Sequence, residues 1–198
     1  MRHPPVAVAL VHHPVLDRRG DVVTTAVTNL DVHDIARTAR TYGVTRFYVV
    51  TPVEEQGARV ERLLDHWRRG FGASYNPDRR EALELVETVA TVDEALTRWE
   101  SFAGEPAVPV LTGAGRTDGI SFARCRQLSR TRPLLIALGT GWGLAPCLFE
   151  QGWTVLSPVA GVGGYNHLPV RAAAAIILDR LFGRGSTLEV TKRQRRNQ

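Results

Sequence analysis

Two glycine-rich loops each follow a short apolar run in the second half of the sequence. The first run, Leu134–Leu138, continues as GTGWGL, and the second, Trp153–Leu156, continues as SPVAGVGGYNHLPV. Because glycine lacks a Cβ atom, the backbone N–H and C=O groups of such loops can approach a ligand closely. We therefore expect two neighbouring parallel strands whose loops meet at the carboxyl edge of a sheet, where open α/β folds bind ligands.

A third glycine loop follows the apolar run Ala107–Leu111, which continues into Thr112-Gly113-Ala114-Gly115 and should end at the same edge. A single glycine loop is usually only a turn, whereas loops at adjacent strand ends favour a ligand site. The letters GTGWG do not fit the dinucleotide pattern G-x-G-x-x-G. No Lys-Ser or Lys-Thr follows these glycines, as a phosphate-binding P-loop would require.

A second group of chemically active side chains lies on one predicted helix, Asn29–Tyr42. Asp34 and Arg37 are three positions apart and could form an ion pair. His33 and Arg40 share much of one helix face with Arg37. Two interpretations stay open, namely a site that acts on a substrate and a solvated helix with internal ion pairs. The group comprises Asn29, Asp31, His33, Asp34, Arg37 and Arg40.

Aromatic and basic residues alternate between positions 66 and 80. A predicted helix, Glu54–Arg69, ends in this stretch, which continues as GFGASYNPDRR. Rings stack on unpaired bases and guanidinium groups bind phosphates, so the mixture suits RNA. The alternative is a helix end whose rings are core and whose arginines are solvated. The members are His66, Trp67, Arg68, Arg69, Phe71, Tyr75, Asn76, Arg79 and Arg80.

Apolar runs alternate with helix-forming segments along the whole sequence. Val6–Val11 and Arg46–Thr51 flank the first helix, and such a strand, helix, strand unit favours a right-handed crossover in a parallel sheet. Glu87–Ala90 is a further strand, followed by a helix that we expect Asp93 to cap. The Ala-rich run Ala172–Leu181 is a good helix former. We predict a single α/β domain with a mostly parallel sheet of five or six strands and helices on both faces.

Length and composition are those of an ordinary globular domain, with 198 residues, 43% of them hydrophobic and 23% charged. The formal net charge is +5, and residues 184–198 hold five basic side chains against one acidic. We therefore expect a domain over residues 1–183 and a basic, flexible tail over 184–198. Such a tail can hold RNA phosphates or only improve solubility.

The sequence gives little support for a metal-binding or a membrane-spanning protein. Cys125 and Cys147 are too few for a disulfide framework or a metal cluster, and His12 and His13 lack an acidic or Cys partner at ligand spacing. We expect no metal site. No apolar stretch approaches about 18 residues, and the N-terminal run lacks a signal-peptide cleavage pattern. We therefore expect a cytoplasmic protein without a membrane segment.

The order of these motifs resembles the C-terminal half of the SPOUT superfamily of S-adenosylmethionine-dependent RNA methyltransferases. In its tRNA ribose-methylating branch, a glycine loop closes in Gly-Leu, a corner reads I-P-M-x-G, and an Asn precedes an Ala-rich helix. The positions that match these motifs are Gly139, Gly143, Leu144, Pro158, Gly161 and Asn166. The chain is still more similar to a bacterial SPOUT family with the motifs TNLDxHDIARxARTYG and YNHLSVRxAAAIILDRL, although Pro169 replaces the Ser of the second motif.

This resemblance implies a C-terminal trefoil knot and a homodimer with the site near the subunit interface. It also implies S-adenosylmethionine as the methyl donor and RNA, either tRNA or rRNA, as the acceptor. The implied cofactor-binding residues are Thr112, Gly113, Gly139, Thr140, Gly141, Trp142, Gly143, Leu144, Ser157, Pro158, Val159, Gly161, Tyr165, Asn166, His167 and Leu168.

The resemblance also assigns roles on the first helix. Arg37 falls on the functional arginine of the first motif of the ribose-methylating branch, so we expect it, with Asn29, to orient the acceptor or a nearby phosphate. Asp31 and His33 replace the Asn and Gly of that motif, so the acceptor atom need not be a ribose hydroxyl. Asp34 or His33 is the candidate base. The candidate RNA-binding residues are Arg40, Arg68, Arg69, Tyr75 and Arg79.

Two other functions stay open. A SPOUT-like protein that binds RNA or a nucleotide without catalysis is consistent with the departures at Asp31, His33 and Pro169. A nucleotide-dependent oxidoreductase is the third. Methyl incorporation into RNA separates catalysis from binding, and a comparison of cofactor affinities identifies an oxidoreductase.

Overall fold

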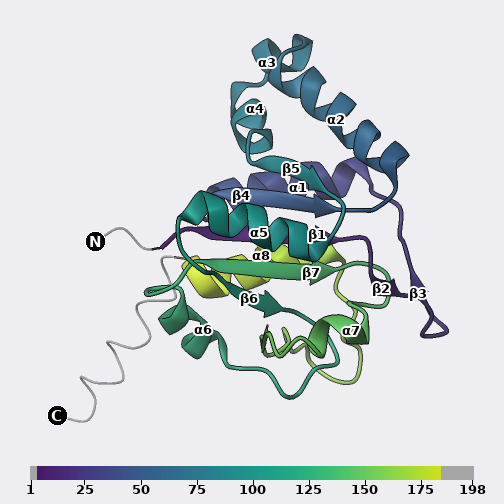
Figure 1. The fold of residues 1–198 in the computed structure, drawn as a ribbon, viewed down its shortest axis with the longest axis vertical. Coiled ribbons are helices and arrows are strands. Elements are labelled where there is room, and N and C mark those ends of the chain that lie inside the picture. The colour runs from purple at the N-terminus through teal and green to yellow at the C-terminus, as the bar shows by residue number, and fades with distance from the viewer. Residues whose placement is uncertain (1–3, 184–198) are drawn as a thin grey trace.

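Six parallel strands form the main sheet of the computed structural model, which describes residues 4–183. Their order is β5-β4-β1-β7-β6-β8 (Figure 1). They are β1 (Val6–Val11), β4 (Arg46–Val50), β5 (Val86–Val89), β6 (Val108–Leu111), β7 (Leu134–Gly139) and β8 (Thr154–Val155). A separate antiparallel hairpin, β2 (Val15–Leu16) and β3 (Val22–Val23), follows β1. The predicted parallel sheet is confirmed, and the predicted tail at 184–198 lies outside the described residues.

Helices cover both faces of the sheet, as predicted (Figure 1). α1 (Asn29–Thr41), α6 (Phe122–Leu128) and α8 (Val170–Phe182) share one hydrophobic cluster with one face. α5 (Val92–Ala103) and α7 (Pro146–Phe149) pack with the other. Within residues 4–183, none of the helices combines the length and apolar character that crossing a bilayer requires.

The central strand shows why the apolar runs could be recognised. Every residue of β1 is buried, and successive side chains alternate between the two faces. Val8 and Leu10 pack in the cluster of α1 and α8, whereas Ala9 and Val11 pack in the cluster of α5. A strand buried on both faces has no polar side, so it reads as a continuous apolar run.

An arm projects beyond the β5 edge of the sheet (Figure 1). It consists of α2 (Glu54–Arg68), α3 (Phe71–Tyr75) and α4 (Pro77–Leu83). Its inner surface joins the cluster that contains α1, because Leu64 of α2 and Leu83 of α4 are fully buried there. The arm is therefore packed against the first helix rather than attached only at its ends.

Two details differ from the sequence prediction. β7 and β8 are not neighbours, because β6 pairs with both and lies between them. The third glycine loop therefore lies between the first two. The N-cap of α5 is Thr91 rather than Asp93, because Thr91 has the extended backbone of a cap and its side chain accepts a hydrogen bond from Glu94 N at 3.0 Å.

Candidate functional site

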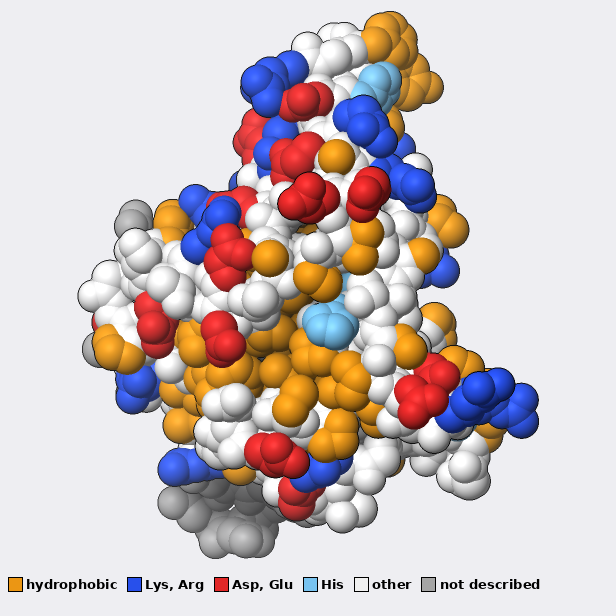
Figure 2. Space-filling view, turned by 45° about the vertical axis from the view of Figure 1, so that its right-hand side comes forward, with side chains coloured by type: hydrophobic (Ala, Val, Ile, Leu, Met, Phe, Trp, Pro, Cys, Tyr) orange, Lys and Arg blue, Asp and Glu red, His pale blue; other side chains and the backbone are white. Residues whose placement is uncertain are grey.

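A cavity of about 1250 Å³ opens at the carboxyl edge of the sheet, where the loops after β6, β7 and β8 meet. All three predicted glycine loops contribute to its lining. The predicted cofactor-binding residues that line it are Thr112, Gly113, Gly139, Thr140, Gly141, Trp142, Gly143, Leu144, Ser157, Pro158, Val159, Asn166, His167 and Leu168. Figure 2 shows hydrophobic side chains gathered in the lower half of one face of the molecule.

Gly161 and Tyr165, which were also predicted to bind the cofactor, do not line the cavity. Both lie in the long loop between β8 and α8, where the Tyr165 side chain is 78% exposed. This loop is fastened to the β6 loop, because Asn166 Nδ2 donates to the carbonyl oxygen of Ala114 at 3.2 Å. The loop after β8 thus lines the cavity at its start, over residues 157–159, and again from Asn166 onward, but not through Gly161 or Tyr165.

The β7 loop keeps its shape because the β2–β3 hairpin pairs with it. The N–H of Leu16 donates to the carbonyl oxygen of Gly143 at 2.9 Å. A Cβ atom on Gly141, whose φ is +58°, would come within 2.7 Å of the Leu16 carbonyl oxygen. One on Gly139 would come within 2.7 Å of the backbone nitrogen of Leu144. Close backbone packing therefore requires glycine at both positions.

A chain of hydrogen bonds joins the hairpin to this loop at the cavity wall. His12 Nδ1 lies 3.0 Å from Thr25 Oγ1, which lies 2.5 Å from Thr140 Oγ1. All three residues line the cavity. His12 is buried, and within residues 4–183 its Nε2 has no hydrogen-bond partner. Burial lowers the pKa of His12 to about 4, although the nearby charge of Asp31 opposes the shift, so the imidazole is neutral at pH 7.

The polar side chains of α1 are divided between the cavity and a second, smaller cleft. Asp31 lines the cavity. Arg171, in the first turn of α8, lies 3.2 Å from the Asp31 carboxylate and 2.9 Å from that of Asp34. The predicted pairing of Asp34 with Arg37 is wrong, because Arg171 takes the Asp34 carboxylate and Arg37 lines a different cleft. Asn29 is exposed at the start of the helix.

That second cleft measures about 370 Å³ and lies between α1 and α4. Its lining residues are Arg37, Arg40, Thr41, Asn76, Asp78, Arg79, Glu81 and Ala82. Arg40 is ion-paired with Glu81. His33 lies on the same helix, with its ring edge-on to Trp67 at 5.4 Å. Burial lowers the pKa of His33, and the positive charge of Arg79 lowers it further.

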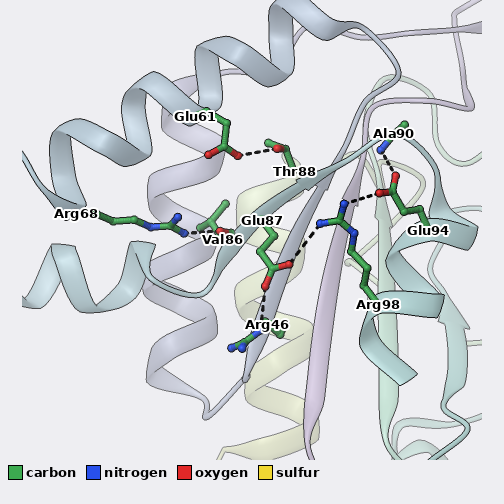
Figure 3. Close-up of polar contacts among 9 residues, drawn as sticks. All are labelled: Arg46, Glu61, Arg68, Val86, Glu87, Thr88, Ala90, Glu94 and Arg98. Carbon is green, nitrogen blue, oxygen red and sulfur yellow. Dashed lines mark hydrogen bonds and ion pairs between the residues drawn. The ribbon is translucent and has the colours of Figure 1, made fainter. Parts of the chain in front are cut away.

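Arg68, a predicted RNA-binding residue, is used within the protein. Its guanidinium donates to the carbonyl oxygen of Leu83 at 2.8 Å. It also donates to the carbonyl oxygen of Val86, a contact drawn in Figure 3. Beside it, Glu61 accepts a hydrogen bond from the Thr88 hydroxyl at 2.7 Å. These contacts join α2 and α4 to β5, so Arg68 anchors the arm to the sheet.

The other predicted RNA-binding residues on the arm differ in how far contacts within the protein hold their side chains. Arg69, the residue after α2, forms an ion pair with Asp65 of that helix. The rings of Tyr75 and Phe71 stack with centroids 5.7 Å apart, and each side chain is 73% exposed. Figure 2 shows hydrophobic side chains at the tip of the arm. Arg79 lies over the ring of Trp67, with 4.7 Å from its guanidinium carbon to the ring centroid.

Sequence reasoning missed the part of the cavity that follows β1. His12, Leu16 and Thr25 reach it because the hairpin folds back, and the turn at Asp17-Arg18-Arg19-Gly20 was the available signal. The other missed lining residues include Ala26, Arg116, Phe149, Glu150 and Arg171. Within residues 4–183, no group of three or more His, Cys, Asp or Glu side chains is arranged to hold a metal ion.

The chain matches a family described as SAM-dependent RNA methyltransferase over residues 5–183. It is 43% identical over 175 residues to a tRNA (guanine-N(1)-)-methyltransferase of Oleidesulfovibrio alaskensis, a match that covers 88% of this chain and 41% of that protein. The chain therefore spans about two fifths of the length of the curated tRNA methyltransferases that it matches.

Solved structures share the fold. The SpoU methyltransferase AviRb from Streptomyces viridochromogenes, solved with AdoMet, is 20% identical with a TM-score of 0.54, covering 92% of this chain and 58% of that one. A TrmH/SpoU tRNA modifying enzyme of A. aeolicus is 16% identical with a TM-score of 0.56, covering 94% and 78%. These likenesses confirm the predicted SPOUT-like fold. The trefoil knot and the homodimer stay predictions.

Proposed function

The chain belongs to the SAM-dependent RNA methyltransferase family, and we propose that it transfers a methyl group from S-adenosylmethionine to a nucleotide of tRNA or rRNA. The observation that carries this proposal is the cavity of about 1250 Å³ between the three glycine loops. Small-ligand cavities usually measure about 300–1,000 Å³. The space is therefore sufficient for the cofactor and part of an acceptor nucleotide.

The lining suits a nucleoside cofactor. Gly139 and Gly141 bring backbone N–H and C=O groups to the surface where a Cβ atom would collide with other backbone. Leu138, Leu144 and Ile177 add apolar surface for a purine ring. The bound cofactor supplies a methyl group that is already electrophilic. The protein then has to hold the donor and the acceptor in line and to accept a proton.

On the acceptor side, we propose that Arg37, with Asn29, orients the acceptor nucleotide or a neighbouring phosphate. Both side chains are exposed on α1. Asp34 and His33 are the proposed proton acceptors. Asp34 is the better placed toward the cofactor, because Arg171 of the cavity wall binds its carboxylate at 2.9 Å. The ring of His33 instead packs against the arm.

The family match supports RNA as the class of acceptor. The relatives are named for methylation of guanine N1 in tRNA, but this chain matches only about two fifths of their length. The named activity belongs to the whole relative. The family described as SAM-dependent RNA methyltransferase, in contrast, matches residues 5–183, so RNA is the class of acceptor that this chain inherits.

We further propose that residues 1–183 act as one domain of a cytoplasmic homodimer. Apolar side chains at the cavity are exposed: Trp142 is 62% and Leu168 is 43% accessible, and both line it. Large exposed apolar side chains beside a ligand site are typical of a surface that a partner covers. A second copy of the chain would cover them and close the cavity.

Two measurements test the function. Calorimetric titration should show saturable binding of S-adenosylmethionine and S-adenosylhomocysteine but not of NAD. Methyl transfer to pooled tRNA and rRNA should then fall at least about 100-fold in Arg37→Ala, since loss of one positioned donor typically costs that much, with cofactor affinity unchanged. Cofactor binding without methyl transfer to any RNA would establish the non-catalytic module instead. Unchanged turnover would remove Arg37 from the mechanism.

A further inference from the structure

The cleft between α1 and α4 contains two arginine side chains without an acidic partner. Three arginines line it, and Arg40 is paired with Glu81. The guanidinium groups of Arg37 and Arg79 have neither an ion pair nor a hydrogen bond within residues 4–183. The cleft thus brings two unpaired cations together from facing helices.

Arg79 is held in this position by packing rather than by charge. Its guanidinium lies over the ring of Trp67 at 4.7 Å, and the side chain is half-buried. Its Nε is buried and has no hydrogen-bond acceptor within residues 4–183. A buried N–H without an acceptor is unfavourable and therefore rare in folded proteins. An oxygen-bearing anion in the cleft would supply the acceptor.

The surroundings are also positively polarised. The pKa of His33 is lowered by burial and then by the charges of Arg79 and Arg37, and only Asp34 opposes them. The lining carries three arginines against two acidic residues, Asp78 and Glu81, and Glu81 is occupied by Arg40, so a net positive charge remains in the cleft. Arginine forks match phosphate oxygens with two parallel hydrogen bonds. Phosphate is therefore the anion that the geometry suits.

We propose that this cleft binds a backbone phosphate of a single-stranded RNA segment between Arg37 and Arg79, while the exposed Phe71–Tyr75 pair stacks on the adjoining bases. The inference rests on the proposed RNA methyltransferase function and assigns the arm as its RNA-binding element. The stacked pair lies on α3, which packs directly against the α4 helix that carries Arg79. A cationic groove beside exposed rings is how proteins commonly hold single strands.

The test is fluorescence anisotropy with a labelled single-stranded RNA of mixed sequence. Arg79→Gln should weaken binding about five- to tenfold and make the slope of log affinity against log salt shallower by about 0.7, the value for one lost phosphate contact on a single strand. Tyr75→Ser should weaken binding at least about fivefold through lost stacking. Affinity for S-adenosylmethionine should not change in either variant.

The matched control is Arg130→Gln, which removes the same charge from an exposed position after α6. It should leave the affinity for RNA within about twofold, because loss of a distant surface charge is largely screened. Arg79→Lys keeps the charge but not the fork and should bind with intermediate affinity, which shows that the loss in Arg79→Gln does not come from unfolding. Equal RNA affinity in wild type, Arg79→Gln and Tyr75→Ser would overturn the proposal.

Two further outcomes keep this inference separate from the proposed function. RNA binding is measured without methyl transfer, so an inactive wild type with Arg79-dependent RNA affinity would still support the cleft. Inorganic phosphate is the second probe. If phosphate binding depends on Arg79 but the affinity for RNA does not, the cleft is a site for free anions. The assignment to RNA is then wrong.

Discussion

The proposed cofactor cavity and the α1–α4 cleft are built from different parts of the chain. The cavity is lined by loops whose glycines let backbone segments pack closely. A Cβ atom on Gly139 or Gly141 would lie only 2.7 Å from a backbone atom of a neighbouring segment. The cleft is lined by long side chains on two helices. A backbone site depends on a few positions without side chains, whereas a side-chain site depends on which charges are left unpaired.

α1 connects the two regions. Its Asp31 and Asp34 bind Arg171 at the cavity wall, while its Arg37 lines the cleft. One helix therefore lies between the proposed sites of donor and acceptor. If the two regions act independently, substitutions in the glycine loops should change only the affinity for S-adenosylmethionine. Substitutions on the arm should change only the affinity for RNA.

The largest expected effect is at the cavity. Gly139→Ala places a methyl group 2.7 Å from the Leu144 backbone nitrogen, so the loop must open. Overpacking of this kind costs about 1–3 kcal/mol, and if this cost falls on the bound state it corresponds to about five- to 150-fold in affinity for S-adenosylmethionine, measured by calorimetry. Gly164→Ala is the matched control in the loop after β8, because Gly164 does not line the cavity and nothing lies within 4 Å of its Cβ. Equal losses in both variants would contradict a site built by backbone closure.

His12 gives the cavity a pH dependence. Its folded-state pKa of about 4 lies below the ordinary 6.5, so the unfolded chain binds the proton more readily. The stability that this supplies is present above pH 6.5 and is lost as the pH falls toward 4, by about 3 kcal/mol in total. Urea unfolding across this range should show the loss in wild type and a smaller one in His12→Asn. Parallel pH profiles would mean that His12 is not buried and neutral.

Arg171→Gln should have a moderate effect that reaches the cavity. The side chain of Asp31 is only 16% exposed, so its ion pair is shielded from solvent. We expect the free energy of unfolding to fall by about 1 kcal/mol and S-adenosylmethionine affinity to fall a few fold, with RNA affinity unchanged. Arg80→Gln, in an exposed pair with Glu84, should cost less than about 0.5 kcal/mol. Indistinguishable unfolding curves for the two variants would show that the ion pairs between α1 and α8 do not stabilise the fold.

The smallest expected effect compares two histidines. Arg79 lowers the pKa of His33 but is not among the groups that act on His12. Arg79→Gln should therefore raise the pKa of His33 and leave that of His12 unchanged, as followed by NMR titration of the ring protons. Binding of inorganic phosphate in the cleft should raise the pKa of His33 in the same direction. A shift of both residues would show a general structural change.

Much of the fold could be read from the sequence because burial leaves a pattern. Val6–Val11 has the predicted bounds since a strand buried on both faces is uniformly apolar. The loops after β6 and β7 were visible because glycine marks close backbone approach. The position of β6 between β7 and β8 was not visible, because strand order depends on crossovers and not on local letters.

Partners of charged side chains were the least predictable feature. Arg68 looked like Arg79 in the sequence, yet it donates to the carbonyl oxygens of Leu83 and Val86 while Arg79 has no acceptor within residues 4–183. Asp34 is paired with Arg171, which is 137 positions away, rather than with its helical neighbour. Such pairings are decided by tertiary contacts, so local spacing cannot supply them.

The most direct test of this account crosses the two regions. S-adenosylmethionine affinity and RNA affinity should be measured on the same preparations of wild type, Gly139→Ala and Arg79→Gln. We expect Gly139→Ala to lose affinity for S-adenosylmethionine and to keep affinity for RNA, whereas Arg79→Gln should do the reverse. The two sites are not separate if Arg79→Gln lowers the affinity for S-adenosylmethionine. The same conclusion follows if Gly139→Ala lowers the affinity for RNA as much as the affinity for the cofactor.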